Sequence, residues 1–400
     1  MAAFLKISIL LFCSSLSFGQ IQGDIQWYIG DKMDHFPSDT AYFQVPNTSD
    51  FEIWTDAMDY IFQDKLDDAN NQLLSLNYHV IEFQDTISEK KYLVIEELSP
   101  NKKYWGTYIL NLQSCRKLVI QCPHPIHDSK TGVQGIFCFQ KLNNFAYFVS
   151  GIHRCYGSDY SNCSGTTKAC SSESAAFKNS DNAHSVASIF QKMTEILNNR
   201  DEHLYFIQLH GFGKKDSDPY MILSNGTKLT PESDILPRFR DNLMAQDTLL
   251  TSKIAHLDDW NHLIGRTNVQ GRLINGEDQP CENQATTVSG RFIHFEQERT
   301  LLRKDSIGWN KVFWALNQTF ECKPVENLDL ENNKFQVFPN PNTGIFQIEH
   351  AYSQIQIYDH LGRCVHFEKQ GNQIRLESKG IFFIRILDEN DVFESKIVIY

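Results

Sequence analysis

The sequence lacks a long apolar stretch beyond its N-terminus, an excess of basic charge and any Cys-x-x-Cys pair. Because a membrane-spanning helix needs about 18 or more apolar residues in a row, no membrane span is expected. The formal net charge of −12 at pH 7 disfavours nucleic acid as a partner, since phosphate binding needs a basic surface. The absence of paired cysteines disfavours a zinc–cysteine cluster.

The length and composition indicate a large core with an appendage. The chain has 400 residues, is 41% hydrophobic and contains 28 Phe and 15 Tyr. Its N-terminus has a basic Lys6, an apolar run and small residues up to Gly19. This is the pattern of a secretory signal peptide over residues 1–19. We therefore expect an exported protein.

Export permits disulfide bonds, and nine of the ten cysteines follow the signal segment. Cys155, Cys163 and Cys170 lie in one loop rich in Ser, Gly and Thr. Such a loop buries little apolar surface, so we expect at least one local disulfide and favour Cys163–Cys170. The odd number leaves at least one free thiol, and the remaining pairing cannot be derived from the sequence.

Residues 20–326 alternate between helical and strand-like patterns, which predicts one α/β domain. We expect a mainly parallel or mixed sheet with helices on both faces. Apolar spacing predicts a helix over residues 51–74 and another over 132–142. A helix opened by His184 is expected next, and Pro237 weakens a fourth helix over 232–244. The expected strands are 78–83, 92–96, 107–112, 118–122, 146–149, 204–210, 220–223 and one that ends at Glu296.

Two apolar runs end in histidines. The run 204–209 leads into His210 and Gly211, and the run 117–122 leads into a Pro-His-Pro segment with His124. Ligands in open α/β sheets bind at such strand ends. With a nearby acid, Asp128, these residues could form a three-ligand zinc site. His127 is an alternative second ligand, and histidines held only by hydrogen bonds are the non-functional alternative.

A hydrolytic metal site also needs a general base, for which Glu296 is the candidate. It lies in an apolar strand, where an unpaired carboxylate is costly to bury. The structural alternative is an ion pair with Arg299 or Arg303.

Arg154 and Arg272 are candidates for stabilising negative charge during catalysis or for binding a substrate carboxylate. Surface salt bridges are the alternative for both arginines. We further expect His153 and His184 to contribute to substrate binding, and for His184 a helix-capping role is the alternative.

Five segments carry a resemblance: 124–128, 151–154, 180–184, 208–211 and 295–297. Together they resemble the zinc-dependent amidohydrolases grouped around N-formylglutamate amidohydrolase and poly-γ-glutamate hydrolase, distant relatives of the zinc carboxypeptidases. The resemblance implies that His124, Asp128 and His210 bind zinc and that Glu296 is the base, and it favours Asp128 over His127. The carboxypeptidases have Glu three residues after the first His, whereas Asp128 follows four residues after it.

The composition changes after residue 326. Residues 327–332 form a polar stretch that is typical of a linker, and residues 333–400 contain short strand-like runs that predict a small β-sandwich. A Pro-Asn-Pro-Asn-Thr-Gly string at 339–344 and a basic, apolar end resemble the type IX secretion sorting domain. The resemblance implies a secreted or cell-surface protein that is exported through the periplasm and the outer membrane, with the secretion machinery as a partner.

Taken together, the sequence predicts an exported zinc hydrolase that acts on an amide or peptide-like bond. The alternative is a surface-displayed binding protein on a degenerate hydrolase scaffold.

Overall fold

The computed structural model describes residues 21–37, 43–99, 102–322, 337–348, 354–359, 363–388 and 391–400. The chain divides into two compact units, Met1–Cys322 and Lys323–Tyr400. The expected signal peptide (1–19) and linker (327–332) lie outside the described residues. No helix in the described part of the chain is long and apolar enough to cross a membrane.

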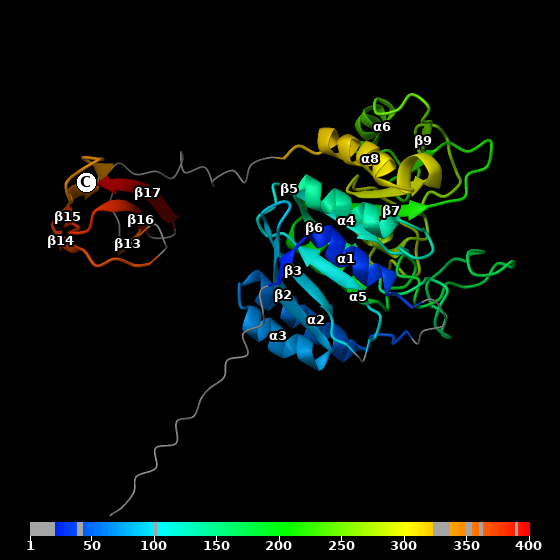
Figure 1. The fold of residues 1–400 in the computed structure, drawn as a ribbon, viewed down its shortest axis with the longest axis horizontal. Coiled ribbons are helices and arrows are strands. Elements are labelled where there is room, and N and C mark those ends of the chain that lie inside the picture. Colours follow the sequence, from blue (N-terminus) through cyan, green and yellow to red (C-terminus); the bar gives the residue numbers. More distant parts are fainter. Residues whose placement is uncertain are drawn as a thin grey trace, which may run out of the picture. The chain divides into compact units, whose positions relative to one another are not determined.

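The first unit is built on a mixed sheet flanked by helices (Figure 1). The sheet has ten strands in the order β1-β2-β3-β4-β6-β5-β7-β10-β8-β9. Its strands are β1 (Ile21–Gly23), β2 (Tyr78–Asp85), β3 (Lys91–Glu97), β4 (Thr107–Leu110), β5 (Arg116–Cys122), β6 (Asn144–Val149), β7 (Tyr205–Gly211), β8 (Met221–Ser224), β9 (Ser252–Ile254) and β10 (Phe292–Gln297). The neighbouring strands β6, β5, β7 and β10 run parallel, so their carboxyl ends meet at one edge of the sheet. The predicted fold class is confirmed.

Helices cover both faces of this sheet, and each face has its own apolar core. One core includes α1 (Ile25–Asp34), α4 (Thr131–Leu142), α6 (Leu236–Met244) and α8 (Ser306–Thr319), together with the π-helix η1 (Arg299–Arg303). The other core includes α2 (Thr48–Phe62), α3 (Leu66–Ser75), α5 (Ile189–Arg200) and α7 (Val269–Ile274).

Three helix boundaries differ from the sequence prediction, each for a local reason. The helix expected over 51–74 is two helices, because Asp64 adopts a positive φ of 59° that interrupts the α-helix. Ser188 caps α5, so His184 precedes that helix by several residues and does not open it. Pro237 lies in the first turn of α6, where the missing backbone N–H is tolerated.

The alternation of side chains along the central strands creates a polar edge on the face covered by α5 and α7. Gln121 of β5 pairs in register with Gln208 of β7, and His210 pairs with Glu296 of β10. Because side chains two residues apart on a strand share a face, His294 lies on the same face as Glu296. The neighbouring positions Leu209 and Phe295 point into the opposite core. The strand ends therefore carry a cluster of histidine, carboxylate and amide groups.

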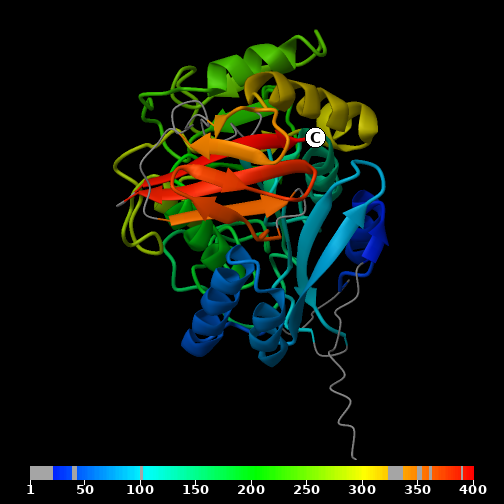
Figure 2. The same ribbon diagram turned by 90° about the vertical axis from the view of Figure 1, so that its left-hand side faces the viewer.

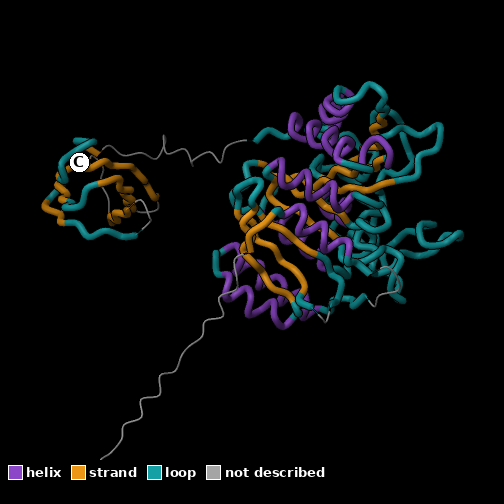
Figure 3. Tube along the Cα trace, in the orientation of Figure 1, coloured by secondary structure: helices purple, strands orange, loops and turns teal. Residues whose placement is uncertain are grey.

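Three disulfides join Cys115 to Cys322, Cys155 to Cys170 and Cys163 to Cys281. A local bridge in the loop between β6 and α5 is therefore confirmed, but the favoured pairing Cys163–Cys170 is wrong. Folding brings the segment of Cys281 to within a Cα–Cα distance of 4.3 Å of Cys163, which leaves Cys155 for Cys170. Figure 3 shows the long loop that these two bridges hold. Cys122, Cys138 and Cys364 are free thiols.

The strands of the second unit are drawn in orange and red in Figure 2. They form two small antiparallel sheets around an apolar core. One sheet has the order β11-β12-β15-β14 and the other β13-β16-β17. Their strands are β11 (Val337–Phe338), β12 (Ile345–Ile348), β13 (Gln354–Asp359), β14 (Glu368–Gln370), β15 (Gln373–Arg375), β16 (Gly380–Asp388) and β17 (Asp391–Ile399).

Candidate metal centre

His124, Asp128 and His210 meet at the carboxyl ends of β5 and β7. The Nδ1 atoms of His124 and His210 lie 3.4 and 3.2 Å from Oδ2 of Asp128. Their ligand atoms all fall within 4.8 Å of one another, a spacing that one metal ion could bridge. All three residues are buried, although 82 residues of chain separate Asp128 from His210.

The opposite nitrogen of each imidazole is already engaged. Nε2 of His124 lies 2.8 Å from Oδ1 of Asp181, and Nε2 of His210 lies 2.7 Å from Oε1 of Gln208. Both oxygens are acceptors, because the Asp181 carboxyl is ionised and the Gln208 amide nitrogen donates to Gln121 instead. Each histidine therefore donates its Nε2–H, an arrangement that is typical of metal-binding histidines.

This tautomer leaves the Nδ1 lone pairs facing a carboxylate. Burial lowers the pKa of His210 to about 4, so its ring is neutral near pH 7. Three electron-pair donors thus converge where a cation would relieve their repulsion.

Asp181 accepts hydrogen bonds from three surrounding side chains, those of His124, Arg154 and His184. Its Oδ2 accepts from Nε and Nη2 of Arg154 at 2.9 and 2.6 Å, while its Oδ1 also accepts from Nδ1 of His184 at 2.8 Å. Burial opposes ionisation of this fully buried carboxyl, but Arg154 and the two histidines lower its pKa well below the usual range. The remaining Arg154 nitrogen, Nη1, lies 3.3 Å from Nδ1 of His124. Arg154 is thus brought to the cluster, facing its centre.

Glu296 reaches the cluster from β10. It lies close to His210 and His294, with ligand atoms of the three within 4.8 Å of one another. Burial and the neighbouring Asp128 raise the pKa of Glu296 well above its usual value, against the effect of Arg154 and Arg303. A carboxyl with a raised pKa is suited to accepting a proton.

The alternative ion pairs of Glu296 do not form among the described residues. Nε2 of His294 lies 3.8 Å from Oε1 of Glu296, but burial lowers the pKa of His294 well below its usual value, so this contact is not an ion pair at neutral pH. Arg303 instead donates to the backbone carbonyls of Gln297 and Ser129. The sheet thus holds Glu296 without a close cationic partner.

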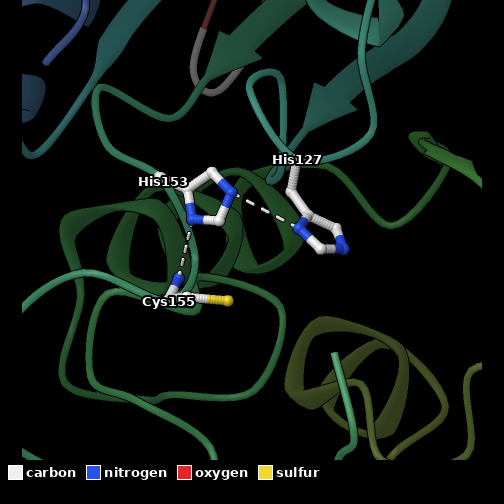
Figure 4. Close-up of side chains that lie close together, drawn as sticks. All are labelled: His127, His153 and Cys155. Atoms are coloured by element: carbon white, nitrogen blue, oxygen red, sulfur yellow. Dashed lines mark hydrogen bonds between the residues drawn. The ribbon is translucent and has the colours of Figure 1, made fainter. Parts of the chain in front are cut away.

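His127 belongs to a separate group, with His153 and Cys155. Its Nδ1 lies 3.4 Å from Nε2 of His153 (Figure 4). Nδ1 of His153 accepts from the backbone N–H of Cys155 at 3.2 Å, so its Nε2 carries the proton and donates to His127. The sulfur of Cys155 is bonded to Cys170. This group is therefore a hydrogen-bonded chain rather than a set of free metal ligands, and Asp128 is the acid beside His124 and His210.

Arg272 is buried but is not brought to the cluster. Its guanidinium donates to the carbonyls of Arg266, Pro280 and Cys281 and to the Ser164 hydroxyl. These bonds tie α7 to the loop that carries the Cys163–Cys281 disulfide. A role of Arg272 in substrate binding stays a prediction.

Asp181, His294 and Gln208 are the cluster residues that sequence reasoning did not single out. The two strand residues had a usable signal, because they lie two positions from Glu296 and His210 and so share their face of the sheet. Asp181 lies in an irregular loop without a periodic signal, although it falls within segment 180–184, which carries part of the resemblance.

The C-terminal unit has a clear relative. Residues 336–400 match the family model of the secretion system C-terminal sorting domain. The resemblance noted from the sequence is therefore confirmed for this part of the chain. No curated protein matches the chain.

Three solved structures show distant similarity. N-formylglutamate amidohydrolase from Ralstonia eutropha JMP134 is 12% identical with a TM-score of 0.32, and the match covers 53% of this chain and 94% of that one. A protein described as carboxypeptidase A from Shewanella denitrificans OS-217 is 11% identical with a TM-score of 0.31, over 64% and 68% of the two chains. A metallo-carboxypeptidase from Burkholderia cenocepacia is 10% identical with a TM-score of 0.29, over 68% and 69%. These are the groups that the sequence motifs resemble, but similarity at this level carries no conclusion about activity.

Proposed function

We propose that this chain is an exported, metal-dependent hydrolase of an amide or peptide-like bond. One observation carries the proposal: the Nδ1 atoms of two buried histidines face the carboxylate of Asp128 at 3.2 and 3.4 Å while their Nε2–H groups are held by acceptors. Nη1 of Arg154, 3.3 Å from Nδ1 of His124, offsets part of the repulsion between these lone pairs, and a metal ion bound by all three residues would offset the rest. The sorting-domain match supports export.

His124, Asp128 and His210 would hold the metal, for which Zn²⁺ fits the mixed nitrogen and oxygen donors. When bound, a zinc ion polarises a carbonyl group and acidifies water. Three protein ligands leave a coordination position for substrate or water, as in other hydrolytic zinc sites.

Glu296 would accept the proton of the attacking water and pass it to the leaving amine. Its burial and its raised pKa make the carboxylate more basic than one in water. His294 contacts both residues: its ring centroid lies 4.6 Å from that of His210, and its Nε2 lies 3.8 Å from Oε1 of Glu296.

Arg154 would stabilise negative charge on the carbonyl oxygen through Nη1, the nitrogen that Asp181 does not bind. His184 and His153 would contact the substrate. His184 donates Nδ1–H to Asp181 and so keeps its Nε2 as an acceptor. His153 holds His127, whose Nε2–H remains as a donor.

The test is hydrolysis by purified protein before and after chelation, on a panel of peptides, γ-glutamyl polymers and peptidoglycan fragments. Amide cleavage that is lost with chelator and restored by zinc supports the proposal. His210→Ala should abolish it, whereas His35→Ala, which changes an exposed histidine on another part of the unit, should not. Ligand binding that survives metal removal, without hydrolysis of any substrate, would instead support the binding-protein alternative.

A further inference from the structure

Arg303 lies beneath the site, on the opposite face of the sheet edge. It is the last residue of η1, and only 5% of its surface is exposed. Its Nε donates to the carbonyl of Gln297 at 3.0 Å, and its Nη1 donates to the carbonyl and hydroxyl of Ser129 at 2.5 and 3.4 Å. Trp309 fixes its backbone through a bond from Nε1 to the Arg303 carbonyl at 2.9 Å.

The guanidinium also packs against Gly211. A Cβ atom at position 211 would lie 2.6 Å from Nη2 of Arg303, and closer still to Cζ and Nε. Real Cβ atoms do not approach other atoms this closely, so only glycine leaves room for the guanidinium here.

These three contacts share one property: each partner directly follows a residue of the proposed site. Ser129 follows Asp128, Gly211 follows His210, and Gln297 follows Glu296. The contacts therefore reach three segments that lie far apart in the sequence. A planar guanidinium with several donors can fix three segments at once, which a single ammonium group cannot do.

We propose that Arg303 is a positioning residue that fixes the segments of Asp128, His210 and Glu296 relative to one another. We call the contacts of Arg303 with Ser129, Gly211 and Gln297 the Arg303 clamp. Its link to metal binding rests on the proposed function, but the clamp itself can be tested in metal-free protein. Burial lowers the pKa of Arg303, while Asp128, Glu296 and Glu298 oppose this shift and favour the charged form. The clamp thus adds a fixed positive charge beneath the two site carboxylates.

The experiment is hydrogen–deuterium exchange of metal-free Arg303→Ala, read by mass spectrometry for peptides that contain Ser129, Gly211 and Gln297. Loss of charge-assisted hydrogen bonds should raise local opening in all three segments together, by about tenfold or more. Millimolar guanidinium should restore protection by occupying the vacated space, while sodium chloride at equal ionic strength should not.

Two further variants keep the test decisive if Arg303→Ala is poorly folded. Gly211→Ala should displace the guanidinium and loosen the same three segments, and Arg303→Lys should give an intermediate effect. The matched control is Arg116→Ala. Arg116 is also buried and binds the carbonyls of Phe320 and Leu142, which lie outside the site. Arg116→Ala should lower the free energy of unfolding without raising exchange selectively in the segments of Ser129, Gly211 and Gln297.

Metal binding provides the second readout. Arg303→Ala should weaken zinc affinity by about 10–100-fold, as loss of groups that orient ligands does elsewhere. The clamp is overturned if Arg303→Ala raises hydrogen exchange in only one of the three segments, or raises it equally across the whole unit. It is also overturned if guanidinium does not restore protection. If the wild type binds no zinc but the three-segment pattern and its rescue are seen, the clamp stands and the proposed function fails.

Discussion

Replacing Asp181 by Asn tests how the buried polar network supports the site. The carboxylate serves four donors, two on each oxygen: His124 and His184 on Oδ1, and two nitrogens of Arg154 on Oδ2. An amide of the same shape has one acceptor oxygen and one NH₂ group that can only donate, so whichever way it is turned, two of the four donors lose their acceptor.

The expected cost has two parts. Removing the charge leaves the buried Arg154 without its ion-pair partner, which should lower the free energy of unfolding by about 3–5 kcal/mol. Losing the acceptor that orients His124 should weaken metal binding by about 10–100-fold. Urea unfolding measures the first part, and competition with a chromogenic chelator measures the second.

Asp85→Asn is the matched control. Asp85 is equally buried, and its partners among the described residues are neutral donors: the backbone N–H groups of Ile25 and Ser88 and the side chains of Ser88 and Gln140. This variant should lose stability and keep its metal affinity. The reasoning is refuted if Asp181→Asn unfolds like the wild type, or if its metal affinity falls no more than that of Asp85→Asn.

Three further predictions concern separate parts of the first unit. Glu296→Gln should lower kcat by about 10²–10⁴-fold with unchanged zinc content, while Glu82→Gln, an exposed control, should alter neither. Burial raises the pKa of Glu97 from 4.5 to about 7, so the folded state binds this proton more tightly than the unfolded state does. The free energy of unfolding should therefore fall by up to about 3 kcal/mol as pH rises from 4.5 to 7. Urea midpoints across this range should change less with pH in Glu97→Gln, and an equal slope in both proteins would contradict the assignment. Replacing Cys115 and Cys322 by Ala removes a disulfide between residues 207 positions apart and should lower the free energy of unfolding by about 2–5 kcal/mol, as measured by urea unfolding. A zinc titration should show unchanged zinc affinity.

Sequence patterns predicted the scaffold and part of the site because both follow from short-range rules. The apolar runs before His124 and His210 become parallel neighbours, β5 and β7, and parallel strands bring their carboxyl ends to one edge. Pro and Gly beside these histidines mark the ends of the runs. The same logic placed Glu296 on β10, which pairs with β7.

The rest of the cluster depends on contacts that no local pattern encodes. Asp181 comes from a loop whose path is set partly by the Cys155–Cys170 and Cys163–Cys281 disulfides, and the second of these joins segments 118 residues apart. Arg303 was considered as an ion-pair partner of Glu296, yet its donors go to backbone carbonyls. Polar side chains have several acceptable partners, and only the three-dimensional packing selects among them.

The most direct test of the account is the position of the metal in crystals grown with zinc, from anomalous scattering at the zinc edge. We predict one strong peak within bonding distance of Nδ1 of His124, Oδ2 of Asp128 and Nδ1 of His210. A peak beside Asp181 and His184 instead, or none at any of these side chains, would contradict the central claim.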